Sequence, residues 1–221
     1  MNKEWSELNK NVQLRIKKKE TFTQGIETLL VLRNQLMEQM LEFKKTLKRE
    51  DFNAMPFPNA EGYHSKTIAY SLYHIFRIED ITANSLVKKG PQIFFANEYQ
   101  RKMNSPIITT GNELAGQEIA EFSSKLDIDG LYGYISEVNT ATADLLKGLS
   151  YSDLKTKMTE ADRENLIKLK TVSEDENAVW LIDYWCGKDV SGLIRMPLSR
   201  HWIMHVEACL RIRNKVRPDL N

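Results

Sequence analysis

Apolar side chains recur at spacings of three and four residues through most of the chain, which places them on one face of a helix. The clearest pattern lies in residues 22–47. Similar patterns lie in residues 64–87 and 112–148 and in a last segment from Pro197 to about Arg217. The pattern in residues 22–47 comprises Ile26, Leu29, Leu30, Leu36, Met37, Met40, Phe43 and Leu47. We therefore predict an all-α fold, a four-helix bundle preceded by a polar, basic helix over residues 2–19.

Glycine and proline residues mark where these helices are expected to stop. Two prolines break the chain in residues 53–62, Gly90-Pro91 ends the second helix, and residues 127–130 interrupt the third region. Residues 91–112 connect the second and third helices, and a short helix is expected at Ile93-Phe94-Phe95. Because such a connection is long enough to cross the bundle, we predict a crossover between helices two and three.

Residues 150–190 are expected to form an inserted helical pair before the last helix. Thr159 with Asp162 and Ser173 with Glu176 resemble capping-box starts, and Gly187 would close the second helix of the pair. A proline at position 197 suits the first position of the last helix. No internal repeat or low-complexity tract divides the sequence, so we predict one domain over residues 1–221 that carries this insertion.

Charge and composition exclude several classes of protein. The 31 basic and 30 acidic side chains give a net charge of +1, so no strong positive field favours nucleic acid or an anionic membrane. Residues 1–5 lack the basic-then-apolar pattern of a signal peptide, and no apolar run reaches the length of a membrane span. Cys186 and Cys209 lack metal-site spacing and fit a reducing compartment. We therefore predict a soluble, cytoplasmic protein that binds neither nucleic acid nor membrane.

Candidate chemistry lies in the histidines of two predicted helices. His201 and His205 are four residues apart, which places both imidazoles on one face of the last helix, one turn from each other. The same face carries Leu198, Cys209 and Ile212, so the pair lies within the apolar stripe. From the spacing alone, a metal-binding pair and a pair of core histidines bonded to backbone or carboxylate groups are both open.

His74 favours the metal-binding interpretation. It lies in the middle of the second predicted bundle helix, among apolar residues such as Ile78. Burying three histidines from two helices without partners is costly, and neutral imidazole is the commonest metal ligand. We therefore predict that His74, His201 and His205 converge to bind a divalent ion, Zn or Ni, which such ligands suit.

Other side chains are candidates for the surroundings of this site. Tyr70, Arg77, Trp202 and Glu207 are close to the histidines in sequence and are predicted to support the ligands or to line a pocket. His64 is expected at one end of the bundle, as a surface or capping residue. An aromatic cluster in the insertion either packs on the bundle or covers the metal as a lid; it comprises Trp180, Tyr184 and Trp185.

Two of these segments resemble the DinB/YfiT-like superfamily. The segment Ser71–Glu79 is similar to its second helix, and Pro197–His205 is similar to its last helix. The resemblance implies a four-helix bundle with a crossover between helices two and three. It also implies that the metal ligands are His74 on helix two and the pair His201 and His205 on the last helix. Some members of this superfamily are bacillithiol or mycothiol transferases or maleylpyruvate isomerases.

Three protein ligands leave one position for water or substrate, which is typical of a catalytic site rather than a structural one. We predict a metal-dependent enzyme that activates a thiol or water for transfer or hydrolysis. Its expected partners are a small-molecule substrate, a low-molecular-weight thiol and a second copy of the chain in a homodimer. The alternative is a non-catalytic helical module for binding or homodimerisation, with a structural or vestigial metal site. An open pocket at the histidines favours the enzyme, and a site filled by Tyr70 or Trp202 favours the module.

Overall fold

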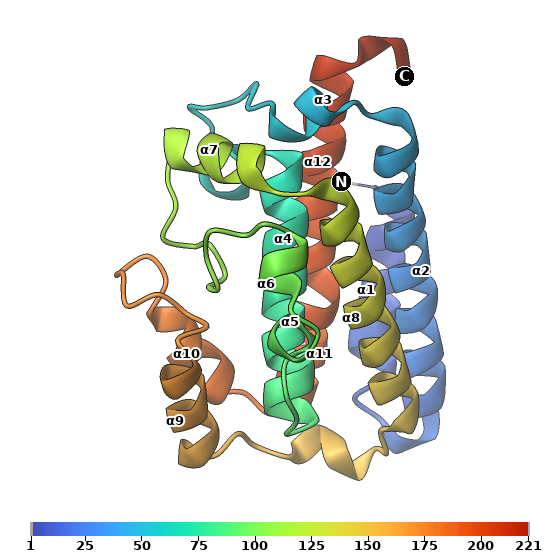
Figure 1. The fold of residues 1–221 in the computed structure, drawn as a ribbon. Coiled ribbons are helices and arrows are strands. Elements are labelled where there is room, and N and C mark those ends of the chain that lie inside the picture. The colour runs from blue at the N-terminus through green and yellow to red at the C-terminus, as the bar shows by residue number, and fades with distance from the viewer. Residues whose placement is uncertain (1, 221) are drawn as a thin grey trace.

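Every regular element of the computed structural model is helical over residues 2–220, the part of the chain that it describes, apart from one isolated bridge between Lys157 and Asp189. The predicted all-α class is therefore confirmed. The long helices are α2 (Phe22–Thr46), α4 (Ile68–Glu79), α8 (Ile128–Gly148) and α12 (His201–Val216). α4 contacts α8 and α12, and α2 contacts the same two helices, which closes a ring of four helices (Figure 1).

Shorter elements surround this ring. α1 (Lys3–Arg15) packs along α2 and buries Trp5 and Val12. It is the predicted leading helix, and it ends at Arg15 rather than at residue 19. Further short elements are η1 (Lys19–Thr21), α3 (Arg49–Asn53), η2 (Gly62–His64) and η6 (Pro218–Leu220), and η4 (Ser152–Lys155) lies at the start of the insertion.

The second helix of the ring begins slightly later than predicted, at Ile68. The side chain of Thr67 accepts the backbone N–H of Tyr70 at 3.1 Å and caps the helix there. Every residue of α4 is buried, because neighbouring elements cover it on all sides. α4 continues directly into η3 (Asp80–Val87), a π-helical segment that ends before Gly90, as predicted.

The connection after η3 crosses from one end of the molecule to the other. α4 and α8 both run from the top to the bottom of Figure 1, so residues 88–127 return the chain to the top. This connection contains α5 (Ile93–Ala96), α6 (Tyr99–Lys102) and α7 (Gln117–Lys125). The third helical region therefore starts at residue 117, later than predicted. Its expected interruption is present, because Asp127 caps α8 by accepting the backbone N–H of Gly130 at 2.7 Å.

The insertion matches the prediction in its first helix and differs in its second. α9 (Glu160–Leu169) starts at the capping box of Thr159. α10 (Trp180–Cys186) starts later than predicted, because the Ser173 hydroxyl accepts the backbone N–H of Asp175 and forms a turn instead of a helix cap. Both helices lie beside the ring of four rather than within it, with α9 against η3 (Figure 1).

The sequence pattern predicts that the last helix begins at Pro197, but the structure differs there. α11 (Val190–Arg195) precedes it, capped by Asp189, whose side chain accepts a backbone N–H of the first turn at 2.8 Å. Pro197 lies within η5 (Met196–Arg200), a π-helical segment that leads directly into α12 at His201. The metal-ligand candidates of the last helix are thus placed immediately after a locally widened turn. Such turns are frequent at functional sites.

A buried ion pair holds this widened turn against the rest of the molecule. The guanidinium of Arg33 on α2 donates to both carboxylate oxygens of Glu79 on α4, at 2.9 and 2.7 Å. It also donates to the Leu198 carbonyl of η5 at 3.2 Å and to the Asn139 side chain of α8 at 2.8 Å. One side chain therefore ties α2, α4 and α8 to the turn that precedes His201.

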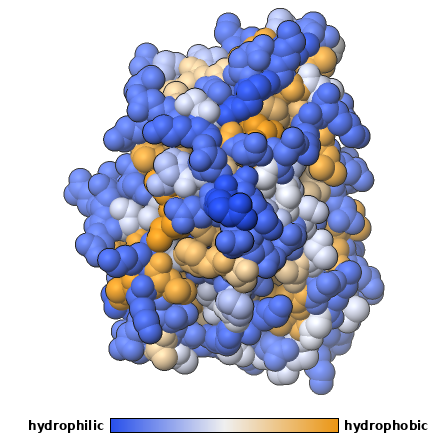
Figure 2. Space-filling view, in the orientation of Figure 1, coloured by the Kyte–Doolittle hydropathy of each residue, from blue (hydrophilic) through white to orange (hydrophobic). Residues whose placement is uncertain are grey.

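The face in Figure 2 is largely hydrophilic, with apolar side chains gathered in patches, one of them over the α9–α10 region. The exposed apolar residues of the insertion are Ile167, Val179, Trp180 and Tyr184. Across residues 2–220, each helix is either too short or too polar to cross a lipid bilayer.

Candidate metal centre

The three predicted ligands come together although two of them are far from the third in sequence. His74 lies in the middle of α4, and His201 and His205 lie one turn apart at the start of α12, which packs against α4. The Nε2 atoms of His74 and His201 are 3.2 Å apart. One ring nitrogen from each of the three lies within 4.8 Å of the others, and all three side chains are buried.

The spacing of these nitrogens fits a tetrahedral metal ion. Two imidazole nitrogens that bind Zn at 2.0–2.1 Å in tetrahedral geometry are separated by about 3.4 Å. The 3.2 Å separation of His74 and His201 is close to that value. His205 completes the set after a small inward shift, because its offered nitrogen lies within 4.8 Å of the other two. The three imidazoles therefore form a group that could hold one shared ion.

All three histidines are held in the neutral form that a metal requires. Burial lowers the pKa of His74 from 6.5 to about 4. Burial, followed by the neighbouring His74, lowers the pKa of His201 well below its usual value. Burial, followed by the other two histidines, does the same for His205. The Nδ1 atoms of His201 and His205 have no hydrogen-bond partner within the described residues, which leaves one buried nitrogen of each ring unsatisfied.

A backbone carbonyl orients His74. Its Nδ1 atom lies 2.9 Å from the carbonyl oxygen of Thr110, so this nitrogen carries the proton and Nε2 presents a free lone pair toward the other histidines. The ring of Tyr70 stacks on His74, with ring centroids 5.5 Å apart. A second hydrogen bond that fixes the tautomer and the ring plane is typical of metal-binding histidines.

The loop that supplies this carbonyl is itself held by α4. Side chains on one face of α4 donate to successive carbonyl oxygens of residues 107–111. The pairs are Tyr73 with Ile107 and Thr109 at 3.2 and 2.9 Å, Arg77 with Ile108 at 2.7 Å, and Tyr70 with Gly111 at 2.9 Å. Gly111 has a φ of +79°, and a Cβ atom there would lie 3.1 Å from the Tyr70 ring. Two of the predicted supporting residues, Tyr70 and Arg77, thus position the loop that orients His74.

The other two predicted supporting residues lie elsewhere. Trp202 is fully buried between the guanidinium of Arg33, 4.1 Å from its ring centroid, and the ring of Phe76. Glu207 accepts a hydrogen bond from the backbone N–H of Asn2. Trp202 therefore belongs to the packing around the buried ion pair, and Glu207 holds the N-terminal segment against α12.

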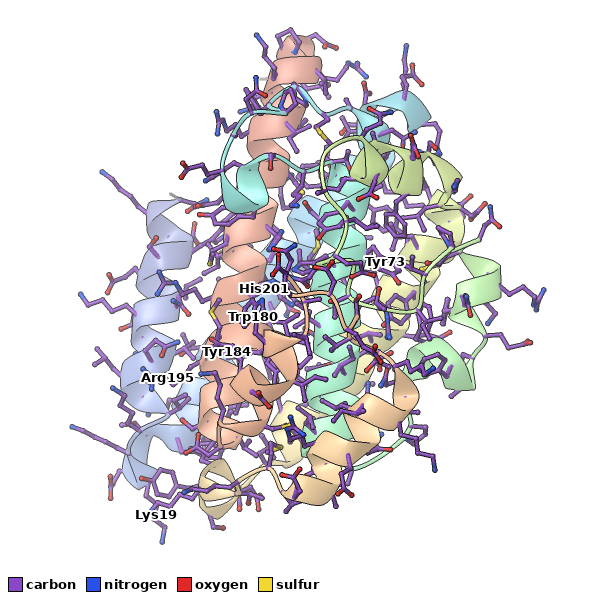
Figure 3. The ribbon with its side chains drawn as sticks, turned by 90° about the vertical axis from the view of Figure 1, so that its left-hand side faces the viewer. Lys19, Tyr73, Trp180, Tyr184, Arg195 and His201 are labelled. Carbon is purple, nitrogen blue, oxygen red and sulfur yellow. The ribbon has the colours of Figure 1, made fainter. Side chains whose placement is uncertain are left out.

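Cavities open on both sides of the three histidines. The first has a volume of about 230 Å³ and is lined by Gly62, Tyr63, Lys66, Tyr70, His74, Asn112 and His205. The second has a volume of about 220 Å³ and is lined by His74, Ile78, Asn112, Trp180, Leu181, Tyr184, Trp185, Met196, Pro197 and His201. Figure 3 shows Trp180 and Tyr184 of α10 beside His201. The aromatic residues of the insertion thus line one of the two cavities, and this apolar cavity shares His74 and Asn112 with the polar one.

Several residues of this centre escaped the sequence-based prediction. Lys66, Thr110 and Asn112 belong to it, and none has a motif that marks it. Thr110 acts through its backbone carbonyl, which every residue type possesses, and Lys66 immediately precedes the helix cap. His64 lies in η2 beside Tyr63, whose ring centroid is 5.7 Å from that of His205.

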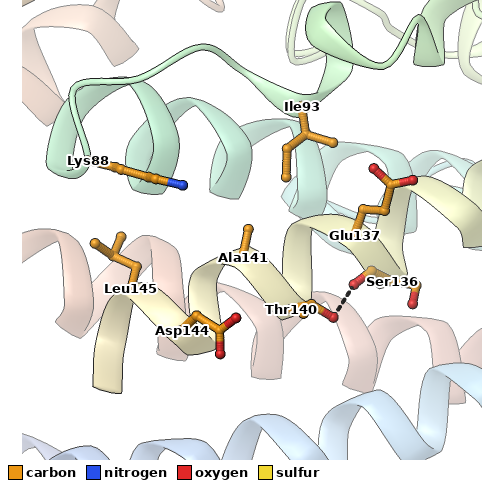
Figure 4. A pocket seen from close by; sticks show the side chains of 8 residues that line it. All are labelled: Lys88, Ile93, Ser136, Glu137, Thr140, Ala141, Asp144 and Leu145. Atoms are coloured by element: carbon orange, nitrogen blue, oxygen red, sulfur yellow. Dashed lines mark hydrogen bonds between the residues drawn. The ribbon is translucent and has the colours of Figure 1, made fainter. Parts of the chain in front are cut away.

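Larger hollows lie away from the histidines. One of about 650 Å³ lies between α8 and the start of the crossover, and its lining includes Lys88, Glu137 and Asp144 (Figure 4). Another of about 850 Å³ lies between the loop at Thr109 and the insertion, and it shares Trp180 with the apolar cavity. Within residues 2–220, the three histidines are the group whose spacing suits a metal ion.

The depressed histidine pKa values predict how the metal-free protein responds to acid. Unfolded histidines bind a proton near pH 6.5, whereas folded His74 does so only near pH 4. The unfolded state therefore binds more protons in this window, and stability falls as the pH drops through it. The free energy of unfolding should decrease by roughly 1.4 kcal/mol per pH unit for each histidine that is protonated only on unfolding.

Urea unfolding of the metal-free protein, measured at several pH values across this window, checks this expectation. A His201→Ala/His205→Ala variant should show a much shallower decrease, because it lacks two of the groups. If the free energy of unfolding fell equally steeply with pH in both proteins, the effect would not originate in His201 and His205.

Comparison with known proteins gives information on the fold and none on the chemistry of the site. No family model matches this chain, and no curated protein matches it. Among solved structures, the chain is similar to a conserved protein from Enterococcus faecalis, with 14% sequence identity and a TM-score of 0.60. The likeness covers 86% of this chain and 92% of that one. At this identity it concerns the fold alone, and it shows that the helical architecture extends over most of both chains.

Proposed function

We propose that this protein is a metal-dependent enzyme in which His74, His201 and His205 hold one divalent ion, Zn or Ni. The observation that carries the proposal is the convergence of three buried, neutral imidazoles from α4 and α12 between two cavities. Coordination by three histidines leaves a fourth position for a substrate or water. The cavities on either side supply the room that this position needs.

The chain's own residues would prepare the site for this chemistry. Thr110 fixes the His74 tautomer, and the surrounding burial keeps all three imidazoles unprotonated at neutral pH. A bound ion would lower the pKa of a thiol or water and so provide a nucleophile for transfer or hydrolysis. The second cavity adds apolar walls beside His201, against which an apolar part of a substrate would pack.

Membership of the DinB-like superfamily is part of the proposal. It is supported by one histidine on the second helix of the ring, by the pair His201 and His205 on the last helix, and by the crossover between α4 and α8. The same pattern makes a low-molecular-weight thiol the first cosubstrate to test.

The position of two aromatic side chains favours an enzyme over a non-catalytic module. Tyr70 stacks on one face of His74 and bonds to a backbone carbonyl, and Trp202 packs against Arg33 and Phe76. All three histidines line a cavity themselves, Tyr70 lies in the wall of the polar cavity and Trp202 lines neither, so a small ligand would have access to the centre. A binding or dimerisation module would need no such access.

Cobalt substitution tests whether the site is open. The Co²⁺-loaded protein should show visible absorption typical of tetrahedral coordination, and a small thiol should add a near-ultraviolet charge-transfer band. The His201→Ala/His205→Ala variant should show neither signal. A Co²⁺ spectrum that changes with neither thiol nor azide would reveal a closed site and overturn the enzymatic proposal.

A further inference from the structure

Lys66 places a positive charge in the polar cavity without a carboxylate to balance it. Its side chain lines this cavity together with His74 and His205, and its Nζ atom lies 5.1 Å from the centroid of the Tyr70 ring. Among the described residues it forms no ion pair. The carboxylate of Glu113, which acts on Tyr70, is bound instead to the Thr109 hydroxyl. The charge of Lys66 is therefore free to face a ligand.

The electrostatics of this cavity favour an anion. Lys66 lines the same cavity as two of the three histidines, so its charge and that of a bound ion would face the same space. Burial lowers the pKa of Lys66 from its usual 10.5, a measure of the cost of holding an unpaired cation there. No carboxylate belongs to the three-histidine group within residues 2–220, so a divalent ion would keep its full charge. An anionic ligand would offset both positive charges.

The cavity on the other side has the opposite character. Apart from the histidines and Asn112, its lining is apolar or aromatic. Helix α10 contributes Trp180 and Tyr184, which Figure 3 labels, and also Trp185. Met196 and the adjacent proline close it from the side of η5. Such a surface accepts an aliphatic or aromatic group and offers it few hydrogen bonds.

We infer that the substrate is a small organic anion with an apolar body that spans the three histidines, its anionic group at Lys66 and its apolar body against Trp180, Tyr184 and Trp185. This inference rests on the proposed function and adds a substrate class to it. The two cavities share His74 and Asn112 in their linings, so they adjoin at the histidines, where the central atom of one such ligand would face the metal position. Each cavity is smaller than the roughly 300 Å³ lower bound of typical ligand sites, which limits the ligand to a small molecule. Lys66 is then a specificity-determining residue.

A matched set of thiols tests this arrangement. In 2-mercapto-3-phenylpropanoate, the sulfur lies between a carboxylate and a benzyl group, as the two cavities require. Its primary amide removes the charge, and 2-mercaptopropanoate removes the ring. Affinities are measured from the charge-transfer band of the Co²⁺-loaded protein. Quenching of tryptophan fluorescence provides an independent measurement in the metal-free protein.

The wild-type protein should bind the carboxylate about tenfold more tightly than the amide, the value of one charge-assisted contact. It should also bind the phenyl compound at least about tenfold more tightly than 2-mercaptopropanoate. Lys66→Gln should abolish the preference for carboxylate over amide, and Lys66→Arg should keep it. Lys88→Gln, which removes a lysine from the hollow in Figure 4, is the matched control and should leave the preference unchanged.

The outcomes separate this inference from the proposed function. Equal affinities for the carboxylate and the amide in both metal-loaded and metal-free wild-type protein would overturn the inference, and this comparison depends on no variant. A preference that survives Lys66→Gln would overturn the assignment of the anion to this lysine. If Co²⁺ does not bind but the metal-free protein still shows the Lys66-dependent preference, the anion site stands and the metal-dependent function falls.

Discussion

Replacing Arg33 by methionine should lower the free energy of unfolding by about 3–5 kcal/mol, because it leaves Glu79 buried without its partner. The Arg33 and Glu79 side chains are 1% and 0% exposed. The replacement also removes the donor to the Leu198 carbonyl at the turn that precedes His201. The start of α12 should therefore loosen, and metal affinity should fall together with stability.

Chemical denaturation followed by circular dichroism measures the loss. The double variant Arg33→Met/Glu79→Leu should recover most of it, because no uncompensated charge remains in the interior. The pair Lys44 and Asp129, with side chains 39% and 87% exposed, provides a matched surface control. Lys44→Met should cost less than about 1 kcal/mol. Similar losses for Arg33→Met and Lys44→Met would contradict the role assigned to the buried pair.

Removal of the metal should destabilise the protein by a comparable amount. A ligand that binds only the folded state adds about 2.7 kcal/mol of stability when its free concentration is one hundred times its dissociation constant. Zn²⁺ added to the metal-free protein should therefore raise the midpoint of thermal unfolding, and a chelator should reverse the rise. The effect requires the three nitrogens that lie within 4.8 Å of one another.

The His201→Ala/His205→Ala variant is the control for this stabilisation. Its melting temperature should not respond to Zn²⁺, because one histidine alone cannot complete the site. Equal stabilisation of the wild-type protein and this variant would place the bound metal elsewhere on the molecule.

The sequence predicts the long helices well because their apolar periodicity reflects real burial. The pattern over residues 22–47 coincides with α2 almost throughout. Helix starts were less predictable, because several residues in each region are able to cap. Ser173 forms a turn with Asp175 instead of starting a helix, whereas Asp189 starts α11, which the sequence pattern did not indicate. Competition between such local hydrogen bonds is decided by packing, which the sequence pattern does not contain.

The sequence likewise predicts some residues of the candidate site and not others. The spacing of His201 and His205 within an apolar stripe, together with His74 on another helix, was sufficient to predict that the three converge. The carbonyl of Thr110 that orients His74 was not predictable, because a backbone group leaves no trace in the sequence. Lys66 was not predictable either, since its approach to the histidines depends on how the chain enters α4.

The metal content of the tag-free protein, measured by elemental mass spectrometry, tests the three-histidine centre most directly. The wild-type protein should contain about one Zn or Ni ion per chain, as expected for a single tetrahedral site. The His201→Ala/His205→Ala variant, folded by circular dichroism, should contain none. Absence of metal from both proteins, even after incubation with Zn²⁺ and Ni²⁺, would contradict the metal centre and the function proposed for it.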